Sequence, residues 1–292
     1  MGVVAGILIG VSVIVAPVIY LTRGDGESEA VPTTQAAVTT TGPLPELKIV
    51  FPEGFTRREM ADRIGAVNEI AEQERGVETR LSPKRYLDLT AKSELPGSFA
   101  GDGKQRSLEG FLFPATYSFT PETTTEELVQ MQLDAFDAAW SKVDLKAAEK
   151  KNLTPYDVLI IASMIEGEVR VPKERALVAA VIYNRLRARM PLGIDATLRY
   201  GLDISPEQPI TQSQLDSDNP YNTARQPGLP PTPIGNPGLA AMQAAAHPAK
   251  SAFLYFALKK DCKSHFFAST LEEHNAFLSG PRSFLRAPDE CA

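Results

Sequence analysis

The sequence predicts an α+β fold for most of the chain, preceded by a membrane-spanning helix and a linker. An apolar run of 19 residues extends from Val3 to Leu21, and a segment rich in Thr, Ala and Pro follows it. Beyond residue 46, short strand-like runs alternate with segments of helical periodicity. The 292 residues are 43% hydrophobic and 23% charged, which is a globular composition. We therefore expect one folded body that a tether attaches to a membrane.

The first 22 residues contain no charged side chain. About 20 apolar residues cover the roughly 30 Å hydrocarbon core of a bilayer, and Tyr20 suits the interface at one end. A cleaved signal peptide is the alternative, but no basic residue precedes the run and no small-residue cleavage motif closes it. We predict a transmembrane anchor over residues 1–22. Arg23 is the only nearby cation, so charge gives no orientation.

Residues 23–45 lack aromatic side chains and apolar periodicity, which predicts a disordered Thr/Pro-rich linker. The folded part begins with a strand over residues 47–51 and a turn at Pro52-Glu53-Gly54. Thr56 and Glu59 then form the capping box of a helix. This strand-turn-helix pattern resembles the LysM-like subdomain of some cell-wall enzymes.

A second helix is predicted from Ser82-Pro83, and Gly and Pro near residues 96–103 close the unit. We expect a small LysM-like subdomain over residues 46–103 and a larger α+β domain over 104–292. The aromatic phrase from Ser107 to Phe119 is typical of a core, although its Glu109 and Tyr117 also suit contact with a sugar. A further helix follows in residues 124–143.

Charge and residue content exclude several classes of function. The net charge of -6 argues against nucleic-acid binding, which needs clustered Lys and Arg to neutralise phosphates. Three histidines lack paired metal-ligand spacing, so we expect no metal and no cofactor. Cys262, near His265, could be a thiol nucleophile, or it could form a disulfide with Cys291; the residues leave both open.

The most informative helix begins at Thr154, an N-cap followed by proline, and extends to Glu168. Helical spacing aligns Glu166 with Val158 and Ala162 on an apolar face, whereas Glu168 points roughly the other way. Enclosure favours a neutral carboxyl, so we expect Glu166 to have a raised pKa and to act as a general acid.

The structural alternative for Glu166 is a buried ion pair with Arg175 or Arg185. The next helix, after Val171-Pro172, places Asn184 on a face where its amide needs an internal hydrogen-bond partner. Three segments beyond it are expected to be rigid cleft loops because they are rich in Pro, Gly and hydrogen-bonding side chains. They are residues 191–197, 219–223 and 228–238.

Several motifs, in this order, resemble the endolytic murein transglycosylases of the MltG, or YceG-like, family. The motifs are LEGFLFPATYSF, IIASMIEGEV, ERALVAAVIYNRL, LGIDATLRYGL, NPYNTARQPGLPPTPIGNPG, AAAHPAK and SHFFASTLEEHN. The resemblance covers about residues 47–280. It implies a single-pass cell-membrane protein whose extracytoplasmic domains cut nascent peptidoglycan strands. The family's catalytic Glu, assigned to the first carboxylate of an A-S-I-I-E-K-E-like helix, corresponds to Glu166, and Gly167 replaces the usual Lys.

A lytic transglycosylase needs one such Glu. It protonates the oxygen between N-acetylmuramic acid and N-acetylglucosamine and then takes the proton of the muramyl C6 hydroxyl, leaving a 1,6-anhydro end. No second carboxylate is required, because water is not the nucleophile. Substrate positioning is expected from seven further residues: Glu109, Asn184, Asp195, Thr197, Tyr221, Asn222 and Thr223.

Two other functions remain open. A muramidase-type hydrolase of the same bond would use Glu166 as the acid and Asp195 or Glu109 to activate water. A non-catalytic wall-binding scaffold would use only the LysM-like part. Peptidoglycan synthases are candidate partners by the resemblance alone.

Overall fold

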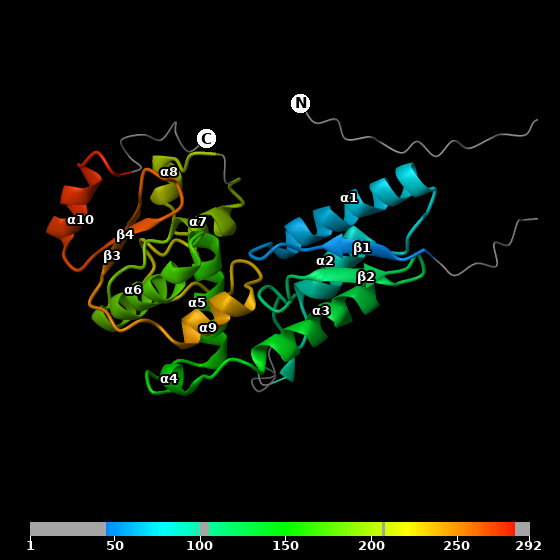
Figure 1. Ribbon diagram of the computed structural model, residues 1–292, viewed down its shortest axis with the longest axis horizontal. Helices are drawn as coiled ribbons and strands as arrows, with labels where there is room; N and C mark the ends of the chain where they lie inside the picture. Colours follow the sequence, from blue (N-terminus) through cyan, green and yellow to red (C-terminus); the bar gives the residue numbers. More distant parts are fainter. Residues whose placement is uncertain (1–44, 98, 100–104, 206–207, 284–292) are drawn as a thin grey trace, which may run out of the picture. The chain divides into compact units, whose positions relative to one another are not determined.

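The computed structural model describes residues 45–97, 99, 105–205 and 208–283. All of them belong to one compact unit that excludes residues 1–43 (Figure 1). The predicted anchor and all of the predicted linker except residue 45 lie outside the described residues. Within the described ranges, no helix is long and apolar enough to cross a membrane.

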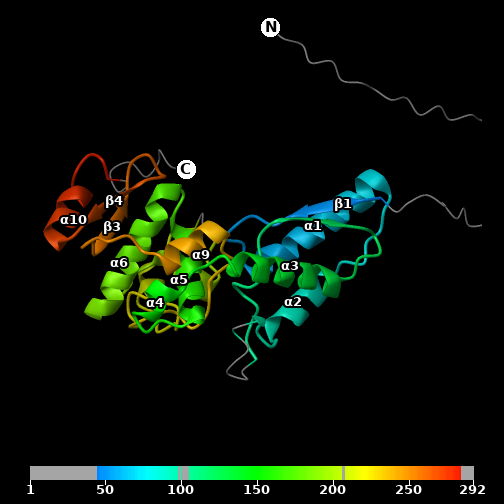
Figure 2. The same cartoon turned by 60° about the horizontal axis from the view of Figure 1, so that its bottom comes forward.

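The N-terminal half of this unit, residues 45–140, combines a two-stranded sheet with three helices (Figures 1 and 2). Its elements are β1 (Leu47–Val50), α1 (Arg57–Arg75), α2 (Pro83–Ala91), β2 (Thr116–Phe119) and α3 (Thr125–Trp140). β1 pairs antiparallel with β2, so that Leu47 lies opposite Phe119. The predicted boundary between residues 103 and 104 therefore falls between two strands of the same sheet.

Capping boxes define where α1 and α3 begin. Thr56 accepts a hydrogen bond from the Glu59 N–H at 3.2 Å, and the Glu59 carboxylate accepts one from the Thr56 N–H at 2.7 Å. Thr124 and Glu127 repeat the arrangement at α3. Each box satisfies donors that a helix start leaves free. The predicted strand and helix starts at Thr56 and Ser82 are confirmed.

The C-terminal half, residues 141–283, is mainly helical and ends in a β-hairpin with one helix packed against it. Its elements are α4 (Lys146–Glu149), α5 (Pro155–Glu168), the 3₁₀ helix η2 (Pro172–Glu174), α6 (Arg175–Ala188), α7 (Asp195–Leu202), α8 (Gln212–Leu215), α9 (Leu239–Ala246), β3 (Tyr255–Leu258), β4 (His265–Ala268) and α10 (Leu271–Leu278). α9 packs along α5, and β3 pairs antiparallel with β4. The predicted helix from Thr154 is confirmed.

One predicted loop is partly helical. Residues 191–197 were expected to form a cleft loop, but α7 begins at Asp195. The Pro and Gly residues occupy the approach to the helix, where Gly193 has a φ of 59°. The Ala-Thr-Leu-Arg-Tyr sequence that follows contains residues compatible with a helix. Asp195 and Thr197 therefore lie on a helix.

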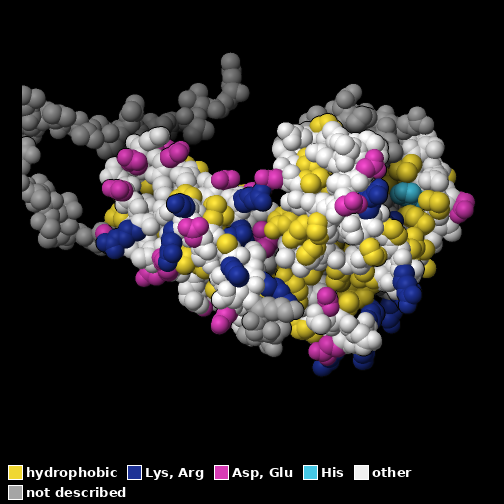
Figure 3. All heavy atoms as spheres, turned by 180° about the vertical axis from the view of Figure 1, so that it is seen from behind, with side chains coloured by type: hydrophobic (Ala, Val, Ile, Leu, Met, Phe, Trp, Pro, Cys, Tyr) yellow, Lys and Arg dark blue, Asp and Glu magenta, His cyan; other side chains and the backbone are white. Residues whose placement is uncertain are grey.

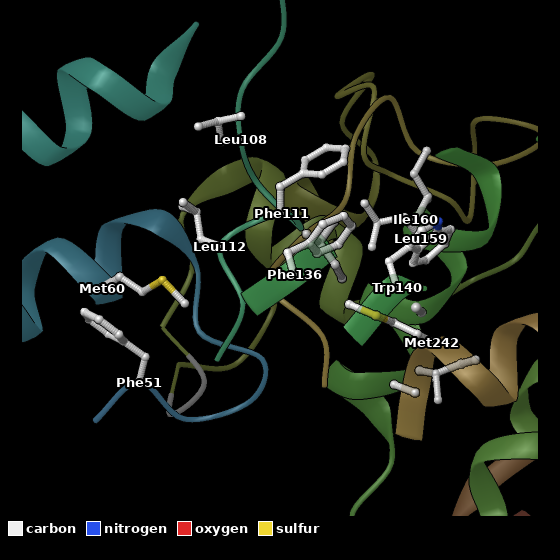
Figure 4. Packing of buried hydrophobic residues seen from close by; sticks show 14 of the residues in the cluster. Phe51, Met60, Leu108, Phe111, Leu112, Phe136, Trp140, Leu159, Ile160 and Met242 are labelled. Atoms are coloured by element: carbon white, nitrogen blue, oxygen red, sulfur yellow. The ribbon is translucent and has the colours of Figure 1, made fainter. Parts of the chain in front are cut away.

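An aromatic core joins the two halves (Figure 4). Phe111 lies 5.0 Å from Phe136 between ring centroids, and Phe136 stacks on Trp140 at 5.7 Å. Leu159 of α5 belongs to the same buried cluster, as does Met242 of α9. The phrase from Ser107 to Phe119 thus packs mainly as core. This continuous packing fixes the position of α5 relative to α3.

Charges of both signs are interspersed on the face of the molecule drawn in Figure 3. Hydrophobic side chains occupy larger areas of this face on the C-terminal half. Mixed charge of this kind is typical of an ordinary protein surface rather than one that tracks a phosphate backbone.

Candidate functional site

A cavity of about 1070 Å³ lies between the start of α1, the end of α5, α7 and the β3–β4 hairpin. Acidic groups in its wall include Glu109, Glu168 and Asp195, and basic groups include Arg170 and Lys263. Binding sites for small molecules commonly have 300–1,000 Å³. The cavity therefore has room for part of a polymer chain.

Glu168, the last residue of α5, lines this cavity. Burial and, to a smaller extent, the negative charge of Asp195 together raise the pKa of Glu168 to about 7. A hydrogen bond from the Ala196 N–H and the charge of Arg199 oppose this shift in the pKa. A carboxyl of this kind is substantially protonated at neutral pH, so Glu168 can donate a proton to a bound molecule.

Glu109 also borders the cavity, but its carboxylate is saturated with hydrogen bonds. Oε1 accepts bonds from the Arg57 N–H at 3.0 Å and from Asn236 Nδ2 at 2.9 Å, and Oε2 accepts one from the Tyr200 hydroxyl at 3.1 Å. Burial raises the pKa of Glu109 to about 7, and the Arg57 charge and these bonds oppose the shift. Glu109 therefore connects the start of α1 to α7 and to the loop that contains Asn236.

Asn236 is the centre of the same network and is completely buried. Its Oδ1 accepts bonds from the N–H groups of Gly110 and Leu112, both at 2.9 Å. Its Nδ2 donates to Phe55 O at 2.8 Å as well as to Glu109. One side chain thus holds three chain segments together.

Glu166, the predicted acid, lies beside the cavity and is not one of its lining residues. Its side chain is 6% exposed. Oε1 lies 3.4 Å from Nη2 of Arg175, and Oε2 accepts the Gly238 N–H at 3.0 Å. Arg175 is one of the two ion-pair partners considered for it in the sequence. Glu53, from the turn after β1, lies 3.9 Å from the same guanidinium.

The expectation that Glu168, on a different side of α5 from Glu166, is not enclosed is wrong, because its carboxyl is buried. Every residue from Val158 to Ile165 is buried, so protein surrounds α5 on all sides over this span, and only the last turn reaches the cavity. A helix without a solvent-facing side can enclose two carboxyls that point in different directions.

Among the seven predicted positioning residues, Glu109 and Asp195 line the cavity, and five do not. Asn184 donates to the carbonyl oxygens of Ser251 and Phe253, so its amide has the internal hydrogen-bond partners that the sequence predicts. The others also bond within the protein. Thr197 and Thr223 bond to each other, Tyr221 bonds to Thr232, and Asn222 donates to Leu215 O and Ser217 O.

Sequence reasoning missed several cavity and network residues, notably Asn236, Tyr200 and His265. Asn236 is one of several Asn residues in Pro- and Gly-rich loops, and no local pattern distinguishes it. Tyr200 lies five residues after Asp195 in α7, about 140° around the helix from it, so helical spacing from Asp195 gives no signal for Tyr200 either. Cys262 is disulfide-bonded, which excludes a free thiol at that position; Cys291 lies outside the described residues.

A family model for the YceG-like family matches residues 28–279. The chain belongs to the YceG-like family. The endolytic murein transglycosylase of Bacillus subtilis (strain 168) is 32% identical to this YceG-like chain over 233 residues, which are 78% of this chain and 63% of the relative. The one from Streptococcus pneumoniae serotype 2 (strain D39) is 31% identical over 241 residues, with 78% of this chain and 43% of the relative covered.

A solved structure shows the same fold. The crystal structure of a putative YceG-like protein from Listeria monocytogenes matches with a TM-score of 0.61 and 35% sequence identity. The match covers 79% of this chain and 75% of the other. This YceG-like chain thus covers less than two thirds of the length of each of the two curated relatives named above.

Proposed function

We propose that this protein is an endolytic peptidoglycan transglycosylase. It cleaves the bond between N-acetylmuramic acid and N-acetylglucosamine in nascent glycan strands, leaves 1,6-anhydro ends and so terminates strand elongation. Family membership and the names of the curated relatives support this activity. The observation that carries the chemistry is Glu168, a carboxyl with a pKa of about 7 in the wall of the large cavity.

The geometry favours Glu168 over Glu166 as the proton donor. A donor must reach the glycosidic oxygen, and Glu168 lines the cavity whereas Glu166 does not. Glu166 instead uses both carboxylate oxygens within the protein, one beside the Arg175 guanidinium at 3.4 Å and the other as acceptor of the Gly238 N–H at 3.0 Å. We therefore assign the acid role to Glu168 and a supporting role to Glu166, which holds Arg175 and the Gly238 backbone.

In the reaction, Glu168 protonates the leaving oxygen while the bond to muramyl C1 breaks. The carboxylate that forms then removes the proton from the muramyl C6 hydroxyl, and the C6 oxygen bonds to C1. Asp195, also in the cavity wall, contributes negative charge near the positively charged transition state. One proton is donated and one is recovered, so Glu168 ends the cycle protonated.

The proposal also includes the cellular setting. We place a transmembrane anchor at residues 1–22, a linker at 23–45 and the folded unit on the extracytoplasmic side of the cell membrane. The first part of that unit acts as a LysM-like subdomain, and peptidoglycan synthases are candidate partners. The apolar sequence of residues 3–21 supports the anchor. Protease accessibility of the folded unit in intact spheroplasts tests this orientation.

A muramidase-type hydrolase is the second candidate, because Asp195 lies near enough to Glu168 to raise its pKa. A second carboxylate in this position could activate water. Mass spectrometry of the products released from glycan strands by the full-length protein in detergent decides between them. Anhydro-muramyl ends support the transglycosylase, reducing muramyl ends support the hydrolase, and no cleavage by active preparations contradicts both.

A further inference from the structure

A buried Glu–His pair forms part of the cavity wall away from Glu168. His265 Nδ1 lies 2.9 Å from Glu174 Oε2, and the backbone N–H of His265 donates to the same oxygen at 3.0 Å. The two side chains are only 4% and 6% exposed. Because Oε2 already acts as the acceptor for the backbone N–H, Nδ1 is assigned as a second donor to it, and this pair of contacts fixes the orientation of the ring.

This orientation leaves Nε2 as the ring nitrogen for a ligand. His265 lines the cavity, and Nε2 has no hydrogen-bond partner in the described part of the chain. Phe256 meets the ring edge-on at 5.4 Å between centroids, and Phe267 lies at 6.3 Å. These contacts hold the imidazole from the sides. A ring that is nine-tenths buried and held in this way is well preorganised to bind a ligand.

Two of the cations that line the same cavity lie close in sequence to this pair. Arg170 follows α5, and Lys263 precedes β4; both are exposed and line the cavity. Neither forms an ion pair within the ranges that the structure describes. They lie close in sequence to the paired residues, because Arg170 is four residues before Glu174 and Lys263 is two residues before His265. The Glu174–His265 contact brings the two segments together.

From Arg170, His265 and Lys263 we infer that this part of the cavity binds a carboxylate of the stem peptide on the muramyl residue. The inference rests on the proposed function, and it adds a specificity site to it. Unpaired cations in a cavity wall favour an anionic group, and a bare glycan strand of N-acetylated sugars has none besides the lactyl carboxylate that the peptide normally blocks.

The distance from the proposed acid is suitable for this role. Glu168 and Glu174 are six residues apart, so their backbones are separated by at most about 20 Å even in an extended chain. A peptide of several residues attached near the cleaved bond can reach that far. Arg185 also borders the cavity, but its guanidinium donates to Leu192 O and Leu254 O and therefore serves the fold.

The test compares two substrates on the full-length protein in detergent. One is a preparation of glycan strands that retain their stem peptides, and the other is the same preparation after an amidase has removed the peptides and the lactyl carboxylates have been amidated. Values of kcat/KM are measured for the parent and for Arg170→Ala, Lys263→Ala and His265→Asn. Asn can keep a donor near the position of Nδ1, and it removes Nε2. Lys250→Ala, at an exposed lysine outside the cavity lining, is the charge-matched control.

We expect each of the three variants to lower kcat/KM for peptide-bearing strands about 10-fold, mainly through KM, and to change it less than 2-fold for bare strands. Lys250→Ala should change neither. Equal losses on both substrates, or no loss with Arg170→Ala and Lys263→Ala, overturn the inference. These two substitutions are at exposed residues, so misfolding of His265→Asn does not prevent a decision. If the parent cleaves neither substrate, the proposed function itself fails, which is a different result.

Discussion

Glu109 and Glu168 border the same cavity, and burial raises the pKa of each to about 7. Their surroundings differ in hydrogen bonding. Glu109 accepts bonds from a backbone N–H, an amide and a phenol, whereas Glu168 has one backbone N–H and a neighbouring carboxylate. A raised pKa alone therefore does not identify a general acid. The carboxyl must also have a free oxygen that can meet the substrate.

The largest expected effect is the difference in strand-cleavage activity between variants of Glu168 and Glu166. Glu168→Gln removes the transferable proton and should lower strand cleavage by about 10²–10⁴-fold, because general acid catalysis contributes about that much. Glu166→Gln should lower it less than about 10-fold, through displacement of Arg175 and Gly238. Product release by mass spectrometry measures both. A larger loss for Glu166→Gln than for Glu168→Gln would return the acid role to Glu166, as the sequence predicted.

The second prediction concerns the network around Glu109. Asn236→Ala leaves the buried N–H groups of Gly110 and Leu112 without acceptors, and each such group costs about 1–3 kcal/mol. We expect the free energy of unfolding to fall by about 3 kcal/mol. The only tryptophan, Trp140, is buried in the core and reports unfolding in urea through its fluorescence. Asn275→Ala, at an exposed residue of α10, is the control and should change stability by less than about 0.5 kcal/mol.

The sequence predicted the helix that positions the acid better than it predicted the acid. Thr154, Pro155 and Asp157 are local signals, and local signals define where a helix begins. Whether Glu166 or Glu168 meets the cavity depends on which segments pack around the last turn of α5, and those segments are distant in sequence. An argument from an apolar face requires an opposite face in solvent, and α5 has none over Val158–Ile165.

The predicted positioning residues show the same limit. Thr197, Tyr221, Asn222 and Thr223 were selected because polar side chains in rigid loops commonly bind ligands. In the structure they bond to one another, to the Thr232 hydroxyl or to backbone atoms, because buried polar groups must be paired. Residue type and local pattern alone do not distinguish a polar side chain that supports a loop from one that faces the substrate. Nor could they place Asn236, whose partners are up to 181 residues away.

The third prediction concerns the pH dependence of stability, because Glu109 and Glu168 have similar raised pKa values. Each has a folded-state pKa near 7, above the ordinary value of 4.5 for a glutamate, so each favours the folded state below about pH 4.5 and loses that contribution as pH rises through about 7. For each, the loss amounts to at most about 3 kcal/mol. Glu109→Gln should reduce the decline in thermal stability between pH 5 and 8 and keep most of the activity.

Thermal unfolding of the full-length protein at several pH values measures that decline. Glu168→Gln should reduce the decline in thermal stability by a similar amount. Unlike Glu109→Gln, it should also remove most of the cleavage activity. Glu272→Gln, at an exposed residue of α10, should leave the slope as in the parent. Identical slopes in Glu109→Gln and the parent would show that Glu109 is ionised in the folded protein throughout this range.

The smallest effect tests the influence of Asp195 on Glu168. A general acid must be protonated, so kcat/KM for strand cleavage should fall as pH rises above about 7. The negative charge of Asp195 helps to keep that pKa high, and Asp195→Asn removes it. The alkaline decline in activity should then begin roughly half a pH unit to one unit lower. Asp203→Asn is the matched control, because Asp203 also lines the cavity but pairs with Arg58 and is not among the charges that shift Glu168. A decline that begins at the same pH in all three proteins, or at a higher pH in Asp195→Asn, means that the titrating acid is a group other than Glu168.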